Sequence, residues 1–281
     1  MTGVREPAVA GRFYADDAAA LHAQVWETVE HARGPGDLPS PEPGAPDVTG
    51  LVVPHAGLPY SGPVAAHAYA ALASGRPDAI VLVGPNHTGI GDPLAVSDAD
   101  RWRTPLGAVP VADDLRNRLL EASTIATRDD AAHRREHALE VQLPYLQVVY
   151  DDPPPVVPVV MSRQDREVVS DLVAALATAP IDGETVLPIA STDLTHYEPQ
   201  SVAERRDAPV LACIRALEAD GLFEVVERDS HGMCGYGPTA AVLEAADRGG
   251  ATTGDVLAYA TSGDVTGSMD EVVGYCAAGF Q

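Results

Sequence analysis

The sequence contains no lysine, so all 18 of its basic residues are arginine, against 41 acidic residues and a formal net charge of −23. The absence of lysine excludes a Schiff-base lysine and the phosphate-binding lysine of a Walker loop. The strong negative charge argues against nucleic acid and anionic membranes as partners, because both attract positively charged surfaces.

Cysteine is also scarce: the three residues are Cys213, Cys234 and Cys276, and no C-x-x-C pair occurs. This sparse, odd-numbered set argues against a disulfide framework. Cys213 and Cys276 lie in apolar patterns and are expected in the core. Cys234 lies in a glycine-rich turn that opens a predicted helix, and it stays a candidate for chemistry.

Long apolar runs are missing as well, because Pro, Asp or Gly interrupts each hydrophobic stretch before it reaches membrane-spanning length. The N-terminus shows no basic region followed by an apolar core, so no signal peptide is expected. We therefore expect a cytoplasmic protein that is not a membrane partner.

The chain of 281 residues is long enough to bury a sizeable core, and short apolar segments alternate with segments of helical periodicity. This pattern predicts one α/β domain over residues 1–281, with a central, mostly parallel or mixed sheet and helices on both faces. Segment 34–47, rich in Pro, Gly and acidic residues, is interpreted as a surface loop. The main strands are expected at 50–54, 79–83, 156–161, 185–191, 252–261 and 272–280, and the main helices at 16–31, 63–73, 113–122, 136–150, 165–179, 200–220 and 221–228, with a last one ending near 247.

Reactive side chains follow three of these strands. His55 follows the first strand, His87 the second, and Asp193 and His196 follow the strand that ends near 191. A single histidine at a strand end is most often structural. Several such residues together indicate the crevice that an open α/β sheet forms at the carboxyl ends of its strands.

Two histidines with a third, anionic ligand suit a transition metal that keeps open coordination positions. A carboxylate as third ligand is typical of non-haem iron, whereas the Cys234 thiolate favours copper or zinc and, less typically, iron. His196 is then a candidate general acid or base, and Asp193 is a candidate to orient a ligating imidazole.

A second histidine pair forms the pattern H-x-x-E-H between His133 and His137, which is typical of some zinc peptidases. The two intervening arginines would place positive charge beside a metal, so this hypothesis is the less favoured one. Glu136 and His137 are instead expected to line or brace the pocket.

Cys234 is also a candidate nucleophile, because a helix N-terminus lowers the pKa of a thiol and His196 or His231 would be available as base. A cysteine hydrolase is therefore one alternative function, and a non-catalytic metal-binding or interaction component is another. Tyr60 and Tyr236 are candidates to contact a small-molecule substrate, whose identity the sequence does not indicate.

Taken in order, several stretches of the chain resemble the Memo family, whose prokaryotic members are called AmmeMemoRadiSam system protein B. This family is structurally similar to class III extradiol dioxygenases of the LigB type. The resemblance covers nearly the whole chain and rests on the stretches REPAVAGRFY, VVPHAGLPYSG, VGPNHTG, EHALEVQLPYLQ, STDLTHY and MCGYGP.

The resemblance implies a class III extradiol dioxygenase-like fold, with His55 and His87 as metal ligands and Cys234 where the dioxygenases use glutamate. Asp193 and His196 are implied as further pocket residues, and His196 matches the dioxygenase base. Copper or iron is the implied cofactor, with zinc as an alternative, and redox activity is the implied chemistry. The family name also implies a functional association with radical-SAM and AMMECR-type proteins.

Overall fold

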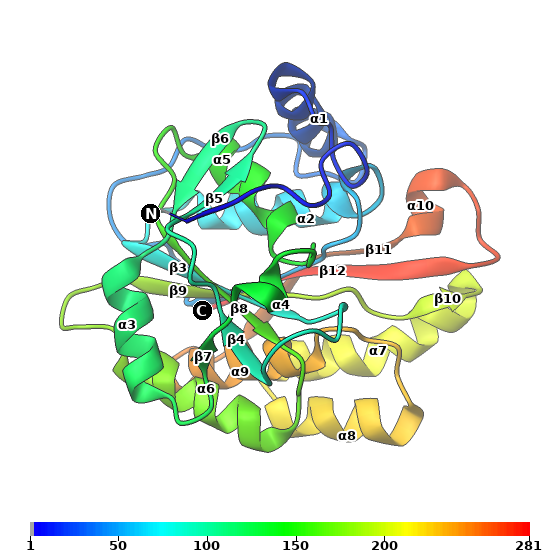
Figure 1. Cartoon of the computed structure of the whole chain (residues 1–281). Coiled ribbons are helices and arrows are strands. Elements are labelled where there is room, and N and C mark those ends of the chain that lie inside the picture. Colours follow the sequence, from blue (N-terminus) through cyan, green and yellow to red (C-terminus); the bar gives the residue numbers. More distant parts are fainter. Residues whose placement is uncertain (1–2) are drawn as a thin grey trace.

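A nine-stranded mixed sheet runs through the centre of the computed structural model, which describes residues 3–281 (Figure 1). Its strand order is β10-β12-β2-β9-β3-β8-β4-β7, and β11 pairs with β12 outside that path. Strands β2, β9, β3 and β8 are parallel neighbours, whereas β12 and β4 join them in antiparallel fashion. The strands are β2 (Gly50–Val53), β3 (Ala79–Pro85), β4 (Leu94–Val96), β7 (Thr127–Arg128), β8 (Val156–Met161), β9 (Val186–Ser191), β10 (His196–Glu198), β11 (Gly254–Thr261) and β12 (Val272–Phe280).

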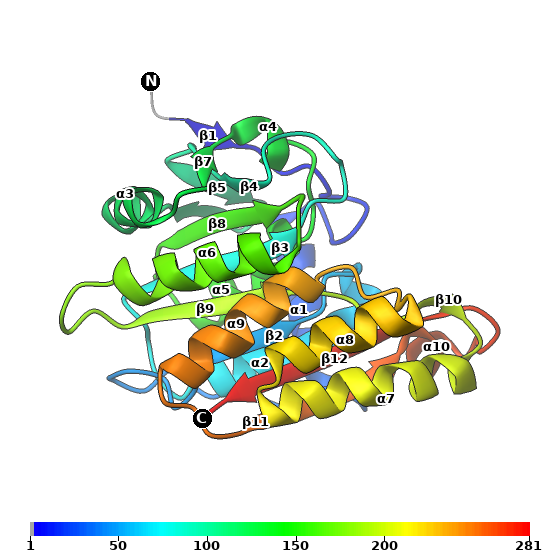
Figure 2. The same cartoon turned by 90° about the horizontal axis from the view of Figure 1, so that it is seen from below.

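Helices cover both faces of this sheet: one set lies above it and another below it in Figure 1, and Figure 2 looks onto the lower set. Successive side chains of a strand point to opposite faces, so Leu51 and Val53 join one core and Val52 the other. The first face carries α1 (Ala18–Glu30), α2 (Leu58–Leu72) and α5 (Leu143–Val149). The second carries α3 (Asp113–Ala122), α6 (Arg166–Thr178), α7 (Gln200–Ala216), α8 (Ala219–Asp229) and α9 (Tyr236–Arg248).

The prediction of a single α/β domain with helices on both faces is therefore confirmed. A small second sheet of β1 (Val4–Arg5), β5 (Arg101–Thr104) and β6 (Gly107–Pro110) packs beside the main one. Segment 34–47 contains no helix or strand. Within the described part of the chain, no helix has the length and apolarity that crossing a membrane requires.

One predicted helix, 136–150, is wrong. The structure replaces it by the short helix α4 (Asp130–His133), a loop, the 3-10 turn η1 (Glu140–Gln142) and α5. Pro144 lies in the first turn of α5, where its missing N–H costs nothing, so it starts a helix rather than kinking one. The loop at 134–139 forms because the Glu136 carboxylate accepts hydrogen bonds from the N–H groups of His137 and Ala138.

The N-terminal segment is held against this loop by a buried ion pair between Arg5 and Glu140. The Arg5 guanidinium also donates to the main-chain oxygens of His133 and Glu136, at 3.0 and 2.6 Å. The Glu140 carboxylate accepts the N–H groups of Ala8 and Val9, at 2.8 and 3.0 Å. Through these contacts, the start of the chain forms part of the wall behind the candidate site.

Candidate metal centre

His55, Asp193 and His87 each lie two residues beyond the end of β2, β9 and β3, respectively. These three strands are adjacent and parallel, so their carboxyl ends meet at one edge of the sheet. The three side chains line one cavity of about 530 Å³, together with His137 and His196. The structure thus brings together the strand-end residues that the sequence singled out.

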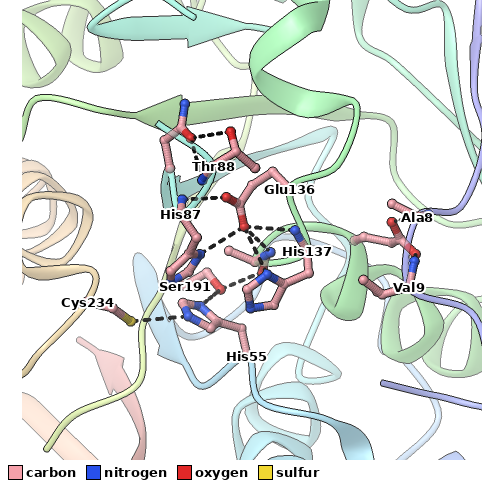
Figure 3. Close-up of polar contacts among 12 residues, drawn as sticks. Ala8, Val9, His55, His87, Thr88, Glu136, His137, Ser191 and Cys234 are labelled. Carbon is pink, nitrogen blue, oxygen red and sulfur yellow. Dashed lines mark hydrogen bonds and ion pairs between the residues drawn. The ribbon is translucent and has the colours of Figure 1, made fainter. Parts of the chain in front are cut away.

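Three imidazoles of this lining, those of His55, His87 and His137, lie close together (Figure 3). One ligand atom from each of His55, His87 and His137 lies within 4.8 Å of the other two. The ring centroids are 4.6 Å apart for His87 and His137, 5.1 Å for His55 and His87, and 5.4 Å for His55 and His137. This spacing suits a single ion held by three imidazole nitrogens.

Glu136 orients two of these rings from behind. Its Oε1 lies 2.9 Å from Nδ1 of His87 and 3.2 Å from Nδ1 of His137, and its Oε2 accepts the His87 N–H at 2.6 Å. Burial alone would raise the pKa of this carboxyl, but the hydrogen bonds from His137 and His87 outweigh burial and lower it. An ionised carboxylate only accepts, so both Nδ1 atoms carry a proton, and the neutral form of each ring offers its lone pair at Nε2.

The proton position on His55 follows from its neighbour Ser191. The Ser191 hydroxyl donates its one proton to the Ala138 carbonyl at 2.7 Å, and Nε2 of Gln142 donates to the same Oγ at 2.9 Å. His55 Nδ1, 2.8 Å from Oγ, must therefore be a donor. Burial and the neighbouring His137 and His87 lower the pKa of His55, so the ring is neutral with an unprotonated Nε2.

Cys234 lies beside the His55 ring, in the loop between α8 and α9. Its Sγ is 3.2 Å from Nε2 of His55 and 3.2 Å from the N–H of Asp193 (Figure 3). Burial, with a smaller contribution from Asp193, raises the pKa of this thiol. Among residues 3–281, Cys234 belongs neither to the three-imidazole group nor to the lining of the cavity.

Asp193 is buried beside His55 but does not orient its ring. Its Oδ1 accepts the main-chain N–H of His55 at 2.8 Å. Burial raises the pKa of its carboxyl. Ser191, which the sequence analysis missed, has the orienting role instead; the only available signal was its position at the end of a strand that leads into Asp193.

His196 presents a free nitrogen to the same cavity. Its Nδ1 lies 2.8 Å from the carbonyl oxygen of Leu194 and 3.0 Å from that of Gly232. Both partners only accept, so Nδ1 carries a proton, and the neutral form of the ring has its lone pair at Nε2. This arrangement suits the predicted role of a general base.

The two candidate tyrosines lie apart. Tyr60 lines the cavity and is 48% exposed. Tyr236 packs edge-on against Phe223, with ring centroids 5.9 Å apart, and does not appear among the described lining residues. Phe13, which the sequence analysis did not single out, lines the cavity and packs on His137 with ring centroids 4.6 Å apart.

His133 and His137 of the H-x-x-E-H pattern do not form a site together. His133 is fully buried, its Nε2 lies 3.1 Å from the Ala95 carbonyl oxygen, and its ring packs edge-on against Trp102. Only His137 belongs to the three-imidazole group. The zinc-peptidase hypothesis requires both histidines to bind one metal, and their separate positions contradict it.

The burial of His133 predicts a pH-dependent stability. Burial lowers its pKa from 6.5 to about 4, so between these values the unfolded chain binds more protons than the folded one. His133 should therefore make the unfolding free energy rise by about 3 kcal/mol from pH 4 to 6.5. Urea unfolding over this range should show a smaller rise for His133→Gln, which keeps a donor for Ala95. Equal pH profiles for both proteins would contradict the prediction.

The chain is similar in sequence to proteins of one described family. Residues 5–279 match the model of a family described as Memo-like protein. The chain is 45% identical over 280 residues to a MEMO1 family protein of Methanopyrus kandleri, covering 99% of each chain. It is 43% identical over 274 residues to one of Methanothermobacter thermautotrophicus, covering 97% of this chain and 98% of the relative.

Among solved structures, an uncharacterized protein from Escherichia coli K12 is similar with a TM-score of 0.55. The similarity covers 82% of this chain and 99% of that chain, at 19% sequence identity. At this identity the similarity is evidence of a shared fold only.

Proposed function

The chain belongs to the Memo-like protein family, and on that premise we propose that it binds copper or iron at its histidine centre and acts as a redox enzyme. The observation that carries the proposal is the arrangement of the three imidazoles. Each Nδ1 faces a protein acceptor, Glu136 for His87 and His137 and Ser191 for His55, so that Nε2 is the nitrogen each ring offers as a ligand. For His55 this nitrogen also contacts the Cys234 sulfur, at 3.2 Å.

The donor set is compatible with copper and with iron. Imidazole nitrogens suit copper, iron and zinc alike, and a thiolate beside them shifts the preference towards softer ions. The His55 nitrogen lies next to both His87 and the Cys234 sulfur, so the set His55/His87/His137 and the set His55/His87/Cys234 share two ligands. Either set would hold a redox-active ion, which would supply one-electron chemistry when bound.

The protein's own contribution to the reaction is binding and proton transfer. The cavity accepts a small molecule against the imidazoles, and Nε2 of His196 accepts a proton from it. Asp193 keeps the His55 main chain in place through its hydrogen bond. The role of Cys234 as a ligand is better supported than that of a nucleophile, because its sulfur lies 3.2 Å from Nε2 of His55 and is not part of the described cavity lining, where a substrate would meet it.

Oxygen consumption by protein loaded with copper or with iron tests the proposal, over a panel of catechols and dithiols. We expect His196→Gln to lower the rate about 100-fold or more while metal content stays at the wild-type value. The control is His22→Gln, an exposed histidine of α1 that should change neither quantity. Loaded wild-type protein that consumes no oxygen with any member of the panel would contradict a redox enzyme and favour the non-catalytic metal-binding alternative.

A further inference from the structure

Exposed aromatic rings gather at the mouth of the cavity. Large hydrophobic side chains that are exposed in residues 3–281 are few, and two of them, Tyr60 at 48% and Tyr197 at 73%, line this cavity. Phe13 adds a third ring to the same lining. Exposed aromatic surface around a concave site is typical of a ligand-binding rim.

The backbone of Tyr197 is held in an unfavourable conformation. Its φ angle is 56°, in the left-handed region, which residues with a β-carbon rarely adopt. The conformation places the Tyr197 ring edge-on to His196, with centroids 5.8 Å apart. Backbone strain of this kind is often found at functional sites, and here it positions an exposed ring beside the proposed base.

Apart from the histidines, the charged side chains that line the cavity are carboxylates. Asp193 and Glu271 both line the cavity, and no arginine does, although the chain has 18 basic residues. Asp193 is engaged with the His55 N–H, but no hydrogen bond or ion pair within the described residues reaches the exposed Glu271 carboxylate. An anionic substrate would meet this carboxylate and find none of the guanidinium groups that usually bind anions.

We propose that the cavity selects a small aromatic molecule with a neutral or cationic side group, whose ring lies against Tyr60 and Tyr197 and whose cationic group faces Glu271. The inference rests on the proposed function only in placing the substrate in this cavity. A cation near tyrosine rings gains a further attraction from their π faces, which an anion lacks. The net charge of −23 acts in the same direction, because it attracts cations and repels anions.

Three probes of nearly equal shape test this selection: tyramine, 4-ethylphenol and 4-hydroxyphenylacetate. Their dissociation constants are measured by ligand-observed NMR or calorimetry at neutral pH, with metal-free and metal-loaded protein. We expect tyramine to bind most tightly and 4-hydroxyphenylacetate at least about tenfold more weakly. Tyr197→Ala should weaken tyramine and 4-ethylphenol alike, since both lose the same ring contact.

The charge of Glu271 is tested by Glu271→Gln, with Asp270→Asn as the matched control. Asp270 is the exposed neighbouring acid and is not part of the lining. Glu271→Gln should weaken tyramine about threefold to fivefold and leave 4-ethylphenol unchanged, whereas Asp270→Asn should change neither. Equal effects of the two substitutions would overturn the role of Glu271.

Tight binding of 4-hydroxyphenylacetate to the metal-free protein would overturn the selection itself, and so would the absence of binding by all three probes. The order of affinities for the metal-free protein does not depend on bound metal, so it stands even where metal binding fails. A reversed order would in turn leave the metal centre intact. Failure of the metal-centre proposal can therefore be distinguished from failure of the proposed substrate selection.

Discussion

The double substitution His55→Ala/His87→Ala is expected to abolish metal binding. These two histidines belong to both candidate ligand sets, so no set of three ligands survives their loss. Wild-type protein reconstituted with copper or iron should hold about one ion per chain, and the variant less than about a tenth of that. Elemental analysis of protein purified without a histidine tag measures the difference.

The single substitutions His137→Ala and Cys234→Ala then decide which third ligand the ion uses. Loss of the true ligand should lower affinity by more than about 100-fold, because loss of an orienting partner alone typically costs 10- to 100-fold. Glu136→Gln should lower metal affinity by this smaller factor of about 10 to 100, since it weakens the acceptor of two Nδ1–H groups.

The control for these variants is His22→Ala together with His67→Ala, which removes two histidines outside the cavity lining. Circular dichroism checks that every variant keeps its helices and strands. Wild-type metal content in the folded double variant would contradict the centre proposed at His55 and His87.

Glu140→Gln is expected to destabilise the fold by about 3–5 kcal/mol. The substitution keeps the shape of the side chain but leaves the buried Arg5 guanidinium without its counter-charge. It also weakens the acceptor that receives the N–H groups of Ala8 and Val9 and the Tyr14 hydroxyl. Urea unfolding monitored by circular dichroism measures the change in the unfolding free energy.

Glu167→Gln is the matched control, because Glu167 pairs with Arg163 on the surface, where both side chains remain in water. We expect no measurable change in its unfolding midpoint. An equal midpoint for Glu140→Gln and the wild type would show that the buried pair is dispensable. The Glu140 substitution should also lower metal affinity, since Arg5 holds the main chain of Glu136, next to His137.

The sequence determined the frame of the site. Strands β8 and β12 and helix α3 coincide with their predicted bounds, because short, mainly apolar runs and a strongly amphipathic segment leave few alternatives. His55 and His87 were found for the same reason: a histidine that directly follows a buried strand has to lie at the carboxyl edge of the sheet. The family was also recognisable from ordered motifs before any geometry was known.

Only the tertiary structure decided which residue supplies the third imidazole and how the three rings are oriented. The Glu136–His137 segment has helical periodicity, but the Glu136 carboxylate binds His87, 49 residues earlier, and that contact prevails over local helix formation. The proton on His55 likewise depends on Ser191, 136 residues away, and on Gln142, which also binds that hydroxyl. Periodicity in a sequence records which face of an element is buried. Hydrogen bonds between distant polar side chains leave no such period. The sequence therefore indicated His137 only as a pocket residue, and its place as the third imidazole and the orientation of all three rings appeared only in the folded chain.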